Sequence, residues 1–510
     1  MINVGEWIKK WSKIHPHKAV LINENRCTTY KEMDRRIDQL CHLLLRMGIL
    51  KGDRVSVLLH NCRQYLEIFF ALSKIGAILV PLNWRLAGPE IEFIIRDSGS
   101  SLLIFETEFE EVIASIRPNL NFSNGGYLTL GPNPPDWAKD YETSVLEHPL
   151  TEPSIETPVG DEDPHIIMYT SGTTGVPKGA VLSHRKTFFN VLNADIFYGL
   201  TPHDVMIVSR PMFHSGGLLV DSAPVLYKGG TLIVRKRFRP SEILETVQKH
   251  RVTLLELPAT VYQFILQLCD LSQYDLSSVR YYVTGGERIP VALLKEYHEK
   301  GITICEIFGQ TEASTITFLP PEYAAVKTGS AGLPVFHGEV RVVDKNAKDV
   351  KPDDVGEIII KGPTLMSGYW NRPDLTAETI RDGWLYTGDL AKTDEEGYIY
   401  IVDREKDMYI SGGENVYPAE IERVFFIHPK VFDVAVVGVP DEKWGEVGKA
   451  CIVLKPGETL TEREALAFLQ GKVGRYKIPK YVEFVEELPK TASGKIQKYL
   501  LKEWHKRSSE

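Results

Sequence analysis

The chain contains 510 residues and carries a formal charge of −9, with 59 lysines and arginines against 68 aspartates and glutamates. At roughly 150 residues per domain, this length predicts more than one domain. Hydrophobic residues make up 43% and charged residues 25%, which is typical of a globular protein and excludes a disordered acidic tail, a collagen and a coiled-coil rod. The acidic balance argues against a general nucleic-acid-binding protein, because neutralising phosphates requires a basic face.

The N-terminal residues 1–18 form a mixed amphipathic run without the apolar core of a signal peptide, and they predict a docking helix. No stretch approaches the roughly 20 apolar residues that cross a bilayer, so we expect no transmembrane segment, while a peripheral membrane contact and a homodimer stay open. The six cysteines are widely spaced and contain no C-x-x-C pair. They predict reduced thiols and a cytoplasmic protein.

Short apolar runs alternate with helical patterns over the first 300 residues. This alternation predicts an α/β fold, in which helices cover both faces of parallel sheets and ligands bind at the carboxyl ends of the strands. A helix is expected at residues 64–75. The expected strands are residues 54–59, 77–81, 102–105, 205–209, 231–234, 253–257 and 281–284.

The sequence pattern changes after about residue 357, where short strand-like runs separated by turns replace the alternation of strands and helices. A charged stretch at residues 403–407 leads into a compact region of about 100 residues, with expected strands and a helix at 462–469. We therefore predict an N-terminal domain at 1–403, a C-terminal domain at 404–510 and a hinge at 403–406. The Pro-rich stretches 131–137 and 151–164 predict surface loops.

The most informative segment is YTSGTTGVPKGAVLSHR at residues 169–185. Its glycines let backbone N–H groups approach an anion, its hydroxyls donate hydrogen bonds, and Lys178 supplies a positive charge, which together favour a polyphosphate cradle. It is not a Walker A loop, because Pro177 and Gly179 flank the lysine. A flexible surface loop is the alternative that composition alone leaves open.

The string YTSGTTGVPKG resembles the signature loop of the AMP-forming acyl-adenylating superfamily, which includes acyl-CoA synthetases, 4-coumarate–CoA ligases, luciferase and nonribosomal adenylation domains. Four further segments resemble motifs of that family and occur in the family's order: FGQTE at 308–312, YTGDL at 386–390, DREKDMYISGGENVYPAEIE at 403–422 and PKTASGK at 489–495. The resemblance covers essentially the whole chain. It implies a large N-terminal domain of mixed and parallel sheets flanked by helices, and a small mobile α+β C-terminal domain.

The resemblance implies an ATP-dependent acid–CoA ligase that forms an acyl-AMP intermediate and then a thioester, with ATP, Mg²⁺ and coenzyme A. Adenylation supplies the acid with a leaving group, since a free carboxylate would have to expel oxide. A medium- or long-chain fatty acid is the favoured substrate, because Ile307 replaces the glycine of many 4-coumarate ligases and narrows a ring slot. An aromatic acid of the feruloyl, coumarate or benzoate type is the alternative. A carrier-protein-loading enzyme and a non-catalytic binding protein are further alternatives.

The resemblance also implies roles for individual residues of the nucleotide site. Lys495 would be catalytic and bridge the substrate carboxylate and the α-phosphate, which Thr311 would contact; Thr170 and Glu312 would hold Mg²⁺. Taken alone, Thr311 and Glu312 also fit a helix N-terminus. The implied ATP- and AMP-binding residues are Thr170, Ser171, Gly172, Thr173, Thr174, Gly175, Lys178, Gly285, Gly286, Glu287, Ile307, Phe308, Gly309, Thr311, Asp389, Arg404 and Lys495.

The remaining implied residues serve the acid, the hinge and coenzyme A. His214, which would also be catalytic, lines the acyl pocket with Gly216, Gly217 and Ile307; a satisfied buried histidine is the alternative reading of His214. Lys406 occupies the hinge position. The implied coenzyme A-binding residues are Gly412, Gly413, Trp444, Tyr476, Lys477 and Lys480.

Overall fold

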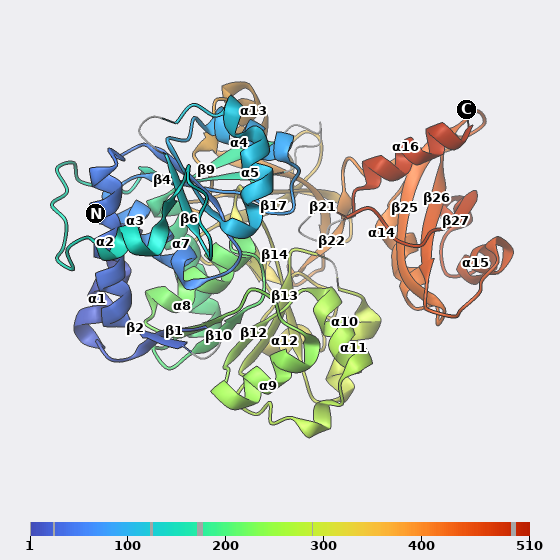
Figure 1. Ribbon diagram of the computed structural model, residues 1–510. Coiled ribbons are helices and arrows are strands. Elements are labelled where there is room, and N and C mark those ends of the chain that lie inside the picture. The colour runs from blue at the N-terminus through green and yellow to red at the C-terminus, as the bar shows by residue number, and fades with distance from the viewer. Residues whose placement is uncertain are drawn as a thin grey trace.

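The computed structural model describes residues 2–23, 26–122, 126–170, 177–287, 289–490 and 496–509. A large N-terminal domain of mixed sheets and helices is followed by a smaller C-terminal domain that stands at one side of it (Figure 1). This architecture confirms the fold class expected from the sequence. Among the described helices, none is both long and apolar enough to cross a membrane.

Two large sheets form the body of the N-terminal domain. In spatial order, the first contains β19 (Gly368–Tyr369), β9 (Lys178–Ser183), β8 (Pro164–Thr170), β4 (Ile78–Pro81), β3 (Arg54–Leu58), β5 (Leu102–Glu106), β6 (Tyr127–Leu130) and β7 (Lys139–Asp140). Its strands β4, β3, β5 and β6 are parallel, whereas β8 and β9 pair in antiparallel fashion. Because a parallel sheet is buried on both faces, its strands are continuous apolar runs, as predicted.

The second large sheet contains, in spatial order, β16 (Leu333–Pro334), β15 (Ser314–Phe318), β14 (Ile304–Gln310), β13 (Tyr281–Gly285), β12 (Leu254–Glu256), β10 (Val205–Val208), β11 (Thr231–Val234), β1 (Ala19–Asn23) and β2 (Arg26–Thr29). The strands from β14 to β1 are parallel. The carboxyl ends of β10, β12, β13 and β14 therefore meet at one edge of the sheet, where ligands commonly bind.

Helices cover both faces of these sheets. The α-helices of the N-terminal domain are α1 (Trp7–Ile14), α2 (Tyr30–Arg46), α3 (Arg63–Ile75), α4 (Gly88–Ser98), α5 (Glu110–Ile116), α6 (Tyr141–Leu146), α7 (His184–Tyr198), α8 (Ala223–Tyr227), α9 (Pro240–His250), α10 (Ala259–Leu268), α11 (Val291–Glu299), α12 (Pro321–Ala324) and α13 (Pro373–Thr379). The 3-10 segments are η1 (Val4–Glu6), η2 (Thr107–Phe109), η3 (Arg117–Asn119), η5 (Leu271–Gln273) and η6 (Arg475–Lys477), and η4 (Gly216–Ser222) is a π-helical segment.

One continuous hydrophobic core joins α2, α3, α7 and α8 to strands of both sheets. Separate clusters pack α9 to α11 on the second sheet and α4 and α5 on the first. Local signals fix the helix ends: Thr29 and Glu32 form a capping box at the start of α2, and Gly76 ends α3 in the left-handed region, with φ of 76°. The predicted docking helix is α1, whose Trp7 and Ile8 are buried.

A third sheet follows, with the order β17 (Glu339–Val343), β18 (Gly356–Lys361), β21 (Trp384–Thr393) and β20 (Ile380–Arg381), and β22 (Ile399–Arg404) pairs with β21. The sheet of the C-terminal domain has the order β24 (Glu414–Val416), β23 (Tyr409–Ser411), β26 (Gly445–Leu454) and β25 (Val431–Asp441), and β27 (Tyr481–Phe484) pairs with β26. The helices α14 (Pro418–Phe426), α15 (Glu462–Leu469) and α16 (Lys498–Ser509) belong to this domain.

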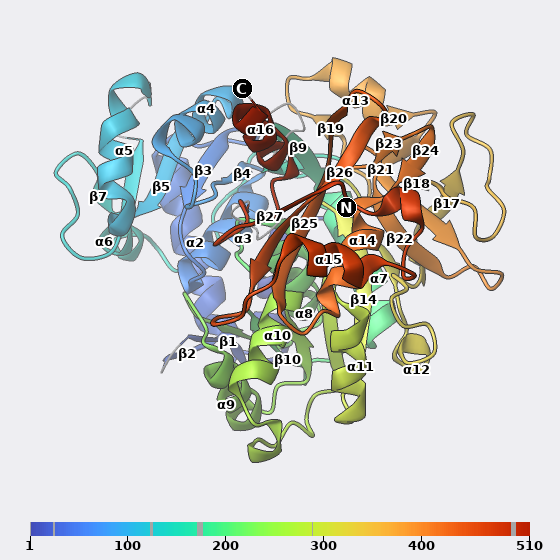
Figure 2. The ribbon, with the colours of Figure 1, turned by 90° about the vertical axis from the view of Figure 1, so that its right-hand side faces the viewer.

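Figure 2 shows the molecule from the side on which the C-terminal domain lies, with β25, α14 and α16 toward the viewer. The chain leaves β22 at Arg404, passes a turn at 405–407 and enters β23 at Tyr409. Phe264 of α10 and Phe432 of β25 face each other across the two domains, with ring centroids 6.5 Å apart. The expected helix 462–469 is α15, and each strand expected in the first 300 residues is present within one or two residues of its expected bounds.

Candidate functional site

A cavity of about 1690 Å³ lies where the two domains meet. Its walls come from the ends of β8 and β14, from the turns around β21 and β22, and from α14 and α16 of the C-terminal domain. Segments far apart in the sequence therefore converge on one space. The predicted site residues that line it are Thr170, Lys178, His214, Gly216, Gly286, Glu287, Ile307, Phe308, Gly309, Thr311, Glu312, Arg404 and Lys406.

The Thr311–Glu312 pair lies in the tight turn between the antiparallel strands β14 and β15. The alternative reading of these residues as a helix N-terminus is therefore wrong: the hydrophobic pattern of residues 314–318 pairs as a strand with β14. Ser314 begins that strand with φ of 61°, a region that side chains rarely occupy. The hydroxyl of Thr311 lies 3.4 Å from that of Ser215, which directly precedes η4, so two separate segments bring two hydroxyl groups together at the cavity wall.

Tyr369 connects the carboxylate of Glu312 with the ammonium of Lys178. Its hydroxyl donates to Oε1 of Glu312 at 2.9 Å, and Nζ of Lys178 lies 4.8 Å from the centroid of its ring. Burial, together with the charge of Glu312, raises the pKa of the Tyr369 hydroxyl, which therefore stays protonated as a donor. Tyr369 thus contacts a cation over its ring and orients a carboxylate through its hydroxyl.

Thr170 and Lys178 are paired across β8 and β9 at the two ends of the predicted phosphate loop. The Thr170 hydroxyl lies 3.5 Å from the main-chain oxygen of Lys178. Strand pairing therefore fixes both ends of the loop at the cavity wall. The predicted residues Ser171, Gly172, Thr173, Thr174 and Gly175 lie outside the described residues.

The carboxylate of Asp389 is buried and held from two sides. Nε of Arg404 lies 2.9 Å from its Oδ1, and the side-chain amide of Gln310 donates to its Oδ2 at 3.1 Å. The same amide donates to the main-chain oxygen of Thr387. Asp389 is 4% exposed and lies behind the cavity wall that Arg404 and Gln310 form. Asp389 lies inside strand β21.

The wall predicted for adenine is formed at the ends of β13 and β14. Gly285 pairs with Ile307 in register, and a Cβ built on Gly285 would lie only 2.7 Å from the main-chain oxygen of Ile307. Gly285 therefore allows the two strands to approach each other, while Gly286 and Glu287 face the cavity. Burial raises the pKa of the Glu287 carboxyl, which accepts a hydrogen bond from the amide of Thr260. Phe308 both packs on the core and lines the cavity.

His214 is half-buried and lines the cavity, so it is not a histidine enclosed in the core. Its Nδ1 accepts a hydrogen bond from the amide of Gly216 at 3.3 Å. Gly216 lines the cavity as well, but Gly217 does not. A Cβ on Gly217 would lie 2.5 Å from the main-chain oxygens of Arg210 and Pro211, so Gly217 allows close backbone packing at the start of η4.

The predicted catalytic Lys495 lies outside the described residues. The described residues on either side of this segment, Lys490 and Ile496, are paired as a β-bridge, and both line the cavity. Nζ of Lys490 lies 2.6 Å from Oδ2 of Asp433. The ends of the lysine segment therefore reach the same space as Thr311 and Glu312.

The predicted coenzyme A residues belong to the C-terminal domain and are not among the residues that line the cavity. Trp444 is 49% exposed and its main-chain oxygen accepts a hydrogen bond from the amide of Gly412, while Gly413 adopts φ of 88°. Tyr476 is 45% exposed. Lys477 and Lys480 are held in ion pairs with Glu420 and Asp441, at 2.5 and 2.6 Å.

Sequence reasoning missed four residues at the site: Lys186, Arg210, Gln310 and Tyr369. Gln310 lies within the FGQTE segment. Arg210 lies two residues after the end of the strand β10, and a charged residue near the carboxyl end of a parallel strand is a signal of a ligand site. Lys186 and Tyr369 carried no such signal, because the first resembles a surface lysine and the second a core aromatic residue. Burial lowers the pKa of Lys186 to about 7, although the negative charge of Glu312 acts in the opposite direction. The Lys186 ammonium donates a hydrogen bond to the hydroxyl of Ser314.

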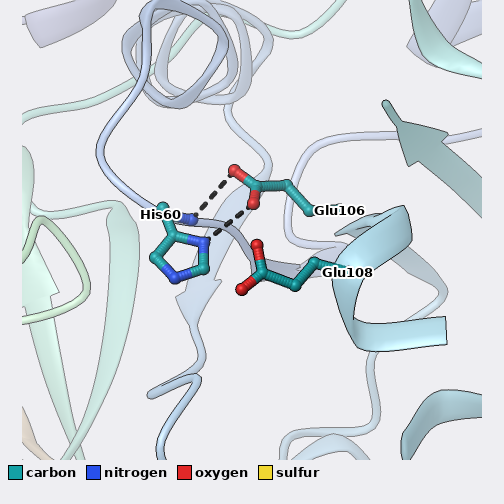
Figure 3. Close-up of side chains that lie close together, drawn as sticks. All are labelled: His60, Glu106 and Glu108. Atoms are coloured by element: carbon teal, nitrogen blue, oxygen red, sulfur yellow. Dashed lines mark hydrogen bonds and ion pairs between the residues drawn. The ribbon is translucent and has the colours of Figure 1, made fainter. Parts of the chain in front are cut away.

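A second cluster of polar side chains lies away from the cavity. His60, Glu106 and Glu108 place three potential metal-ligand atoms within 4.8 Å of one another (Figure 3). Nδ1 of His60 lies 2.8 Å from Glu106, and the ammonium of Lys236 pairs with both glutamates. Because Lys236 already pairs with both carboxylates and Nδ1 of His60 already pairs with Glu106, the arrangement is a salt-bridge network.

Comparison with protein families gives two matches that follow each other along the chain. The family model described as AMP-binding enzyme matches residues 8–370, and the model described as AMP-binding enzyme C-terminal domain matches residues 420–495. Both matched segments contribute residues to the walls of the cavity, and further lining residues come from the stretch between them, such as Arg404 and Lys406.

Curated relatives match over almost their whole length. The chain is 40% identical to a feruloyl-CoA synthase from Amycolatopsis over 97% of both chains, and 36% identical to an indoleacetate–CoA ligase from Aromatoleum aromaticum over 98% of this chain and 97% of the relative. It is 35% identical to the long-chain-fatty-acid–CoA ligase FadD13 from Mycobacterium tuberculosis, over 99% and 98%.

Solved structures share the fold. The anthranilate CoA ligase AuaEII in complex with anthranoyl-AMP matches with a TM-score of 0.92 and 29% identity, over 99% of this chain and 98% of that chain. ATP-bound MatB from Rhodopseudomonas palustris matches with a TM-score of 0.91 and 31% identity over the whole of both chains.

Proposed function

We propose that this chain, which belongs to the family of AMP-binding enzymes and is an AMP-forming acid–CoA ligase, takes an aromatic carboxylic acid as its substrate. The observation that carries the proposal is the 40% identity to a feruloyl-CoA synthase over 97% of both chains. The indoleacetate and anthranilate ligases among the relatives also act on ring-bearing acids by name. The fatty acid that the sequence favoured through Ile307 receives weaker support, from FadD13 at 35% identity.

The first half-reaction joins two anions, so positive charge and orientation dominate its catalysis. We assign Lys178 and the glycine-threonine loop that ends there to the β- and γ-phosphates of ATP, and the Thr311 hydroxyl to the α-phosphate. Lys495 would bridge the α-phosphate and the substrate carboxylate, which His214 would border. The carboxylate oxygen then attacks the α-phosphorus. The bond between the α-phosphorus and the oxygen that bridges to the β-phosphate breaks, and pyrophosphate leaves with that oxygen.

The oxygen ligands at the cavity wall fit a magnesium ion. Mg²⁺ prefers carboxylate and hydroxyl oxygens and keeps phosphate and water ligands. Glu312 faces the cavity with one carboxylate oxygen fixed by Tyr369, and the Thr170 hydroxyl lies at the same wall. These two residues would hold the ion, which supplies charge neutralisation for the phosphates when it is bound.

Asp389 and Arg404 suit the ribose. A buried carboxylate held at fixed orientation can accept hydrogen bonds from two neighbouring hydroxyls, and the Arg404 guanidinium that fixes it also lines the cavity. Phe308 and residues 285–287 would hold the adenine, since a purine needs a flat apolar wall with polar edges.

The second half-reaction needs a thiol to reach the acyl carbonyl. We propose that residues 404–510 rotate about Lys406 as a unit against residues 1–403, because the ends of the lysine segment line the cavity while the coenzyme A residues do not. The rotation would carry Lys495 out and bring Gly412, Gly413 and Trp444 in, with Tyr476, Lys477 and Lys480 meeting the nucleotide part of coenzyme A. We place the enzyme in the cytoplasm, where ATP and coenzyme A are available.

The test is AMP release measured with a panel of benzoates, cinnamates, indole acids and saturated fatty acids, each with and without coenzyme A. The proposal predicts that an aromatic acid gives the highest kcat/KM and that steady release requires coenzyme A. A fatty acid at the head of the ranking would restore the first expectation from the sequence. Transfer to a carrier protein without any transfer to coenzyme A would favour the carrier-loading alternative.

A further inference from the structure

Arg210 lines the cavity and belongs to a buried charged cluster. Arg210 follows β10, lines the cavity together with Gly216, Val220 and Ile307, and is 13% exposed in its side chain. A Cβ built on Gly216 would lie 3.0 Å from Cζ of Arg210. The guanidinium therefore stands directly beside the segment that we assign to the acyl pocket.

Two fully buried carboxylates hold this guanidinium. Nε of Arg210 donates to Asp221 at 3.1 Å, and its Nη2 donates to both Asp221 and Glu256. Glu256 also accepts from the hydroxyl of Tyr198 at 3.2 Å. Because Asp221 comes from η4 and Glu256 from the end of β12, two elements fix the side chain from two sides.

The main chain of Arg210 is fixed as well. The side-chain amide of Asn61 donates to the main-chain oxygen of Arg210 at 2.8 Å and accepts from the amide of Met212 at 2.8 Å. Within the described part of the chain, no residue accepts a hydrogen bond from Nη1 of Arg210. The cluster thus presents one preoriented donor group beside the acyl pocket.

The charges of this cluster balance without a ligand. One guanidinium cannot keep two adjacent buried carboxylates ionised, since each charge loses its hydration on burial. Burial raises the pKa of Glu256 to about 8. The positive charge of Arg210 acts to lower this pKa, and the negative charge of Asp221 acts to raise it. At neutral pH the arginine, one carboxylate and one carboxylic acid sum to zero charge, so the cluster offers hydrogen bonds without a net positive field.

We propose that Arg210 is a specificity-determining residue that donates a hydrogen bond from Nη1 to a neutral oxygen substituent, such as a hydroxyl or methoxy group, on the ring of the acid substrate. This inference rests on the proposed aromatic substrate and deepens it. The fixed donor favours such a ring over one that carries a methyl group in the same place, because the methyl group leaves a desolvated N–H without a partner. A substrate with a second carboxylate is disfavoured, because that group would lie near Asp221 and Glu256, which already share the single positive charge of Arg210.

The test compares acids that differ in one ring substituent: cinnamate and benzoate, unsubstituted or with a methyl, hydroxyl, methoxy or carboxyl group at the meta or para position. The readout is kcat/KM from AMP release that depends on coenzyme A. We expect the best hydroxyl or methoxy acid to exceed its methyl counterpart by about tenfold or more, and every dicarboxylic acid to fall below the methyl acids. Equal values for methyl and oxygen-bearing acids, or a dicarboxylic acid at the top, would overturn the proposal.

A double variant tests Arg210 itself. Arg210→Gln with Asp221→Asn removes one cation and one anion together, so that no unpaired charge is left buried. In this variant, kcat/KM for the hydroxyl acid should exceed kcat/KM for the methyl acid by only about twofold or less, while unsubstituted cinnamate is still turned over. The matched control is Lys228→Gln with Asp195→Asn, which removes an ion pair of 3.0 Å in the same domain away from the cavity and should keep the wild-type ratio.

The outcomes separate this inference from the proposed function. If aromatic acids are substrates but the methyl and hydroxyl acids are used equally, the role of Arg210 is wrong and the aromatic class stands. If only fatty acids are substrates, the aromatic class itself fails. Should the Arg210 variant not fold, the substituent series on the wild-type enzyme still decides.

Discussion

Nε of Arg404 lies 2.9 Å from Oδ1 of Asp389, at directly paired positions of β21 and β22. The main-chain oxygen of the same arginine accepts hydrogen bonds from the amides of Asp407 and Met408 in the turn that leads into the C-terminal domain. The proposed ribose contact and the proposed hinge therefore share one residue. A nucleotide bound at Asp389 as proposed would thereby be connected to the position of the turn.

Asp389→Asn should weaken ATP binding more than it slows catalysis. The amide cannot accept from two ribose hydroxyls and from Arg404 at once, so the KM for ATP should rise about tenfold or more, with a smaller change in kcat. Pyrophosphate exchange at several ATP concentrations measures both values. Asp354→Asn, at an exposed position, is the control; an unchanged KM for ATP in Asp389→Asn would refute the ribose assignment.

Lys495→Ala should abolish adenylation and spare thioester formation. Removing the ammonium leaves the carboxylate and α-phosphate without the bridging charge, so we expect a loss of about 100-fold or more in pyrophosphate exchange. Conversion of supplied acyl-AMP and coenzyme A to the thioester should stay within about threefold of wild type. Lys10→Ala, on the exposed side of α1, should change neither rate. A loss of equal size in both half-reactions would contradict the two-conformation proposal.

Lys406→Pro should impair the second half-reaction more than the first. Proline fixes φ near −65° at the centre of the 405–407 turn and so restricts the rotation that the second step needs. Lys406→Ala is the matched control, because it removes the charge and leaves the backbone free. Single-turnover formation of acyl-AMP and its conversion to the thioester measure the steps separately. Normal thioester formation in the proline variant would remove Lys406 from the hinge.

The buried Lys186 should make stability depend on pH. Its pKa is lowered to about 7 in the folded chain from an ordinary value of 10.5, so between these values the unfolded chain binds a proton that the folded chain does not. The contribution of Lys186 to the free energy of unfolding should therefore rise with pH across that window. The destabilisation that comes from burying a charged ammonium is largest below about pH 7.

Lys186→Met isolates this effect. The advantage of the methionine variant over wild type in the urea midpoint should shrink as the pH is raised from about 7 to about 9. Lys10→Met provides the comparison, since an exposed lysine should give a difference from wild type that does not vary with pH. A constant difference for Lys186→Met over the same range would show that the buried ammonium is not the cause.

The sequence predicted the elements well where local patterns decide. The run RVSVLL becomes β3, and the helical spacing that follows becomes α3, which ends at Gly76 as its left-handed φ requires. Apolar periodicity and capping residues act over a few positions, so they can be read without knowing the tertiary contacts. The same holds for α15.

Elements that depend on distant pairing were harder to predict. The turn at Thr311–Glu312 is fixed by the pairing of β14 with β15. The need for glycine at position 217 comes from the main-chain oxygens of Arg210 and Pro211, a packing contact that apolar periodicity does not reveal. Arg210 belongs to the site because η4 and β12 bring Asp221 and Glu256 to it, over separations that no local pattern spans. The resemblance to a family assigned the residues that we propose for the nucleotide, but it said nothing of this cluster.

The most direct test of the aromatic assignment is a competition. Equal concentrations of one aromatic acid and one fatty acid are supplied together with ATP, Mg²⁺ and coenzyme A, and the two CoA thioesters are quantified by mass spectrometry at low conversion. Their ratio equals the ratio of the two kcat/KM values. We predict that the best aromatic acid outcompetes every fatty acid from hexanoate to palmitate by about tenfold or more; a product pool dominated by fatty acyl-CoA would contradict the assignment.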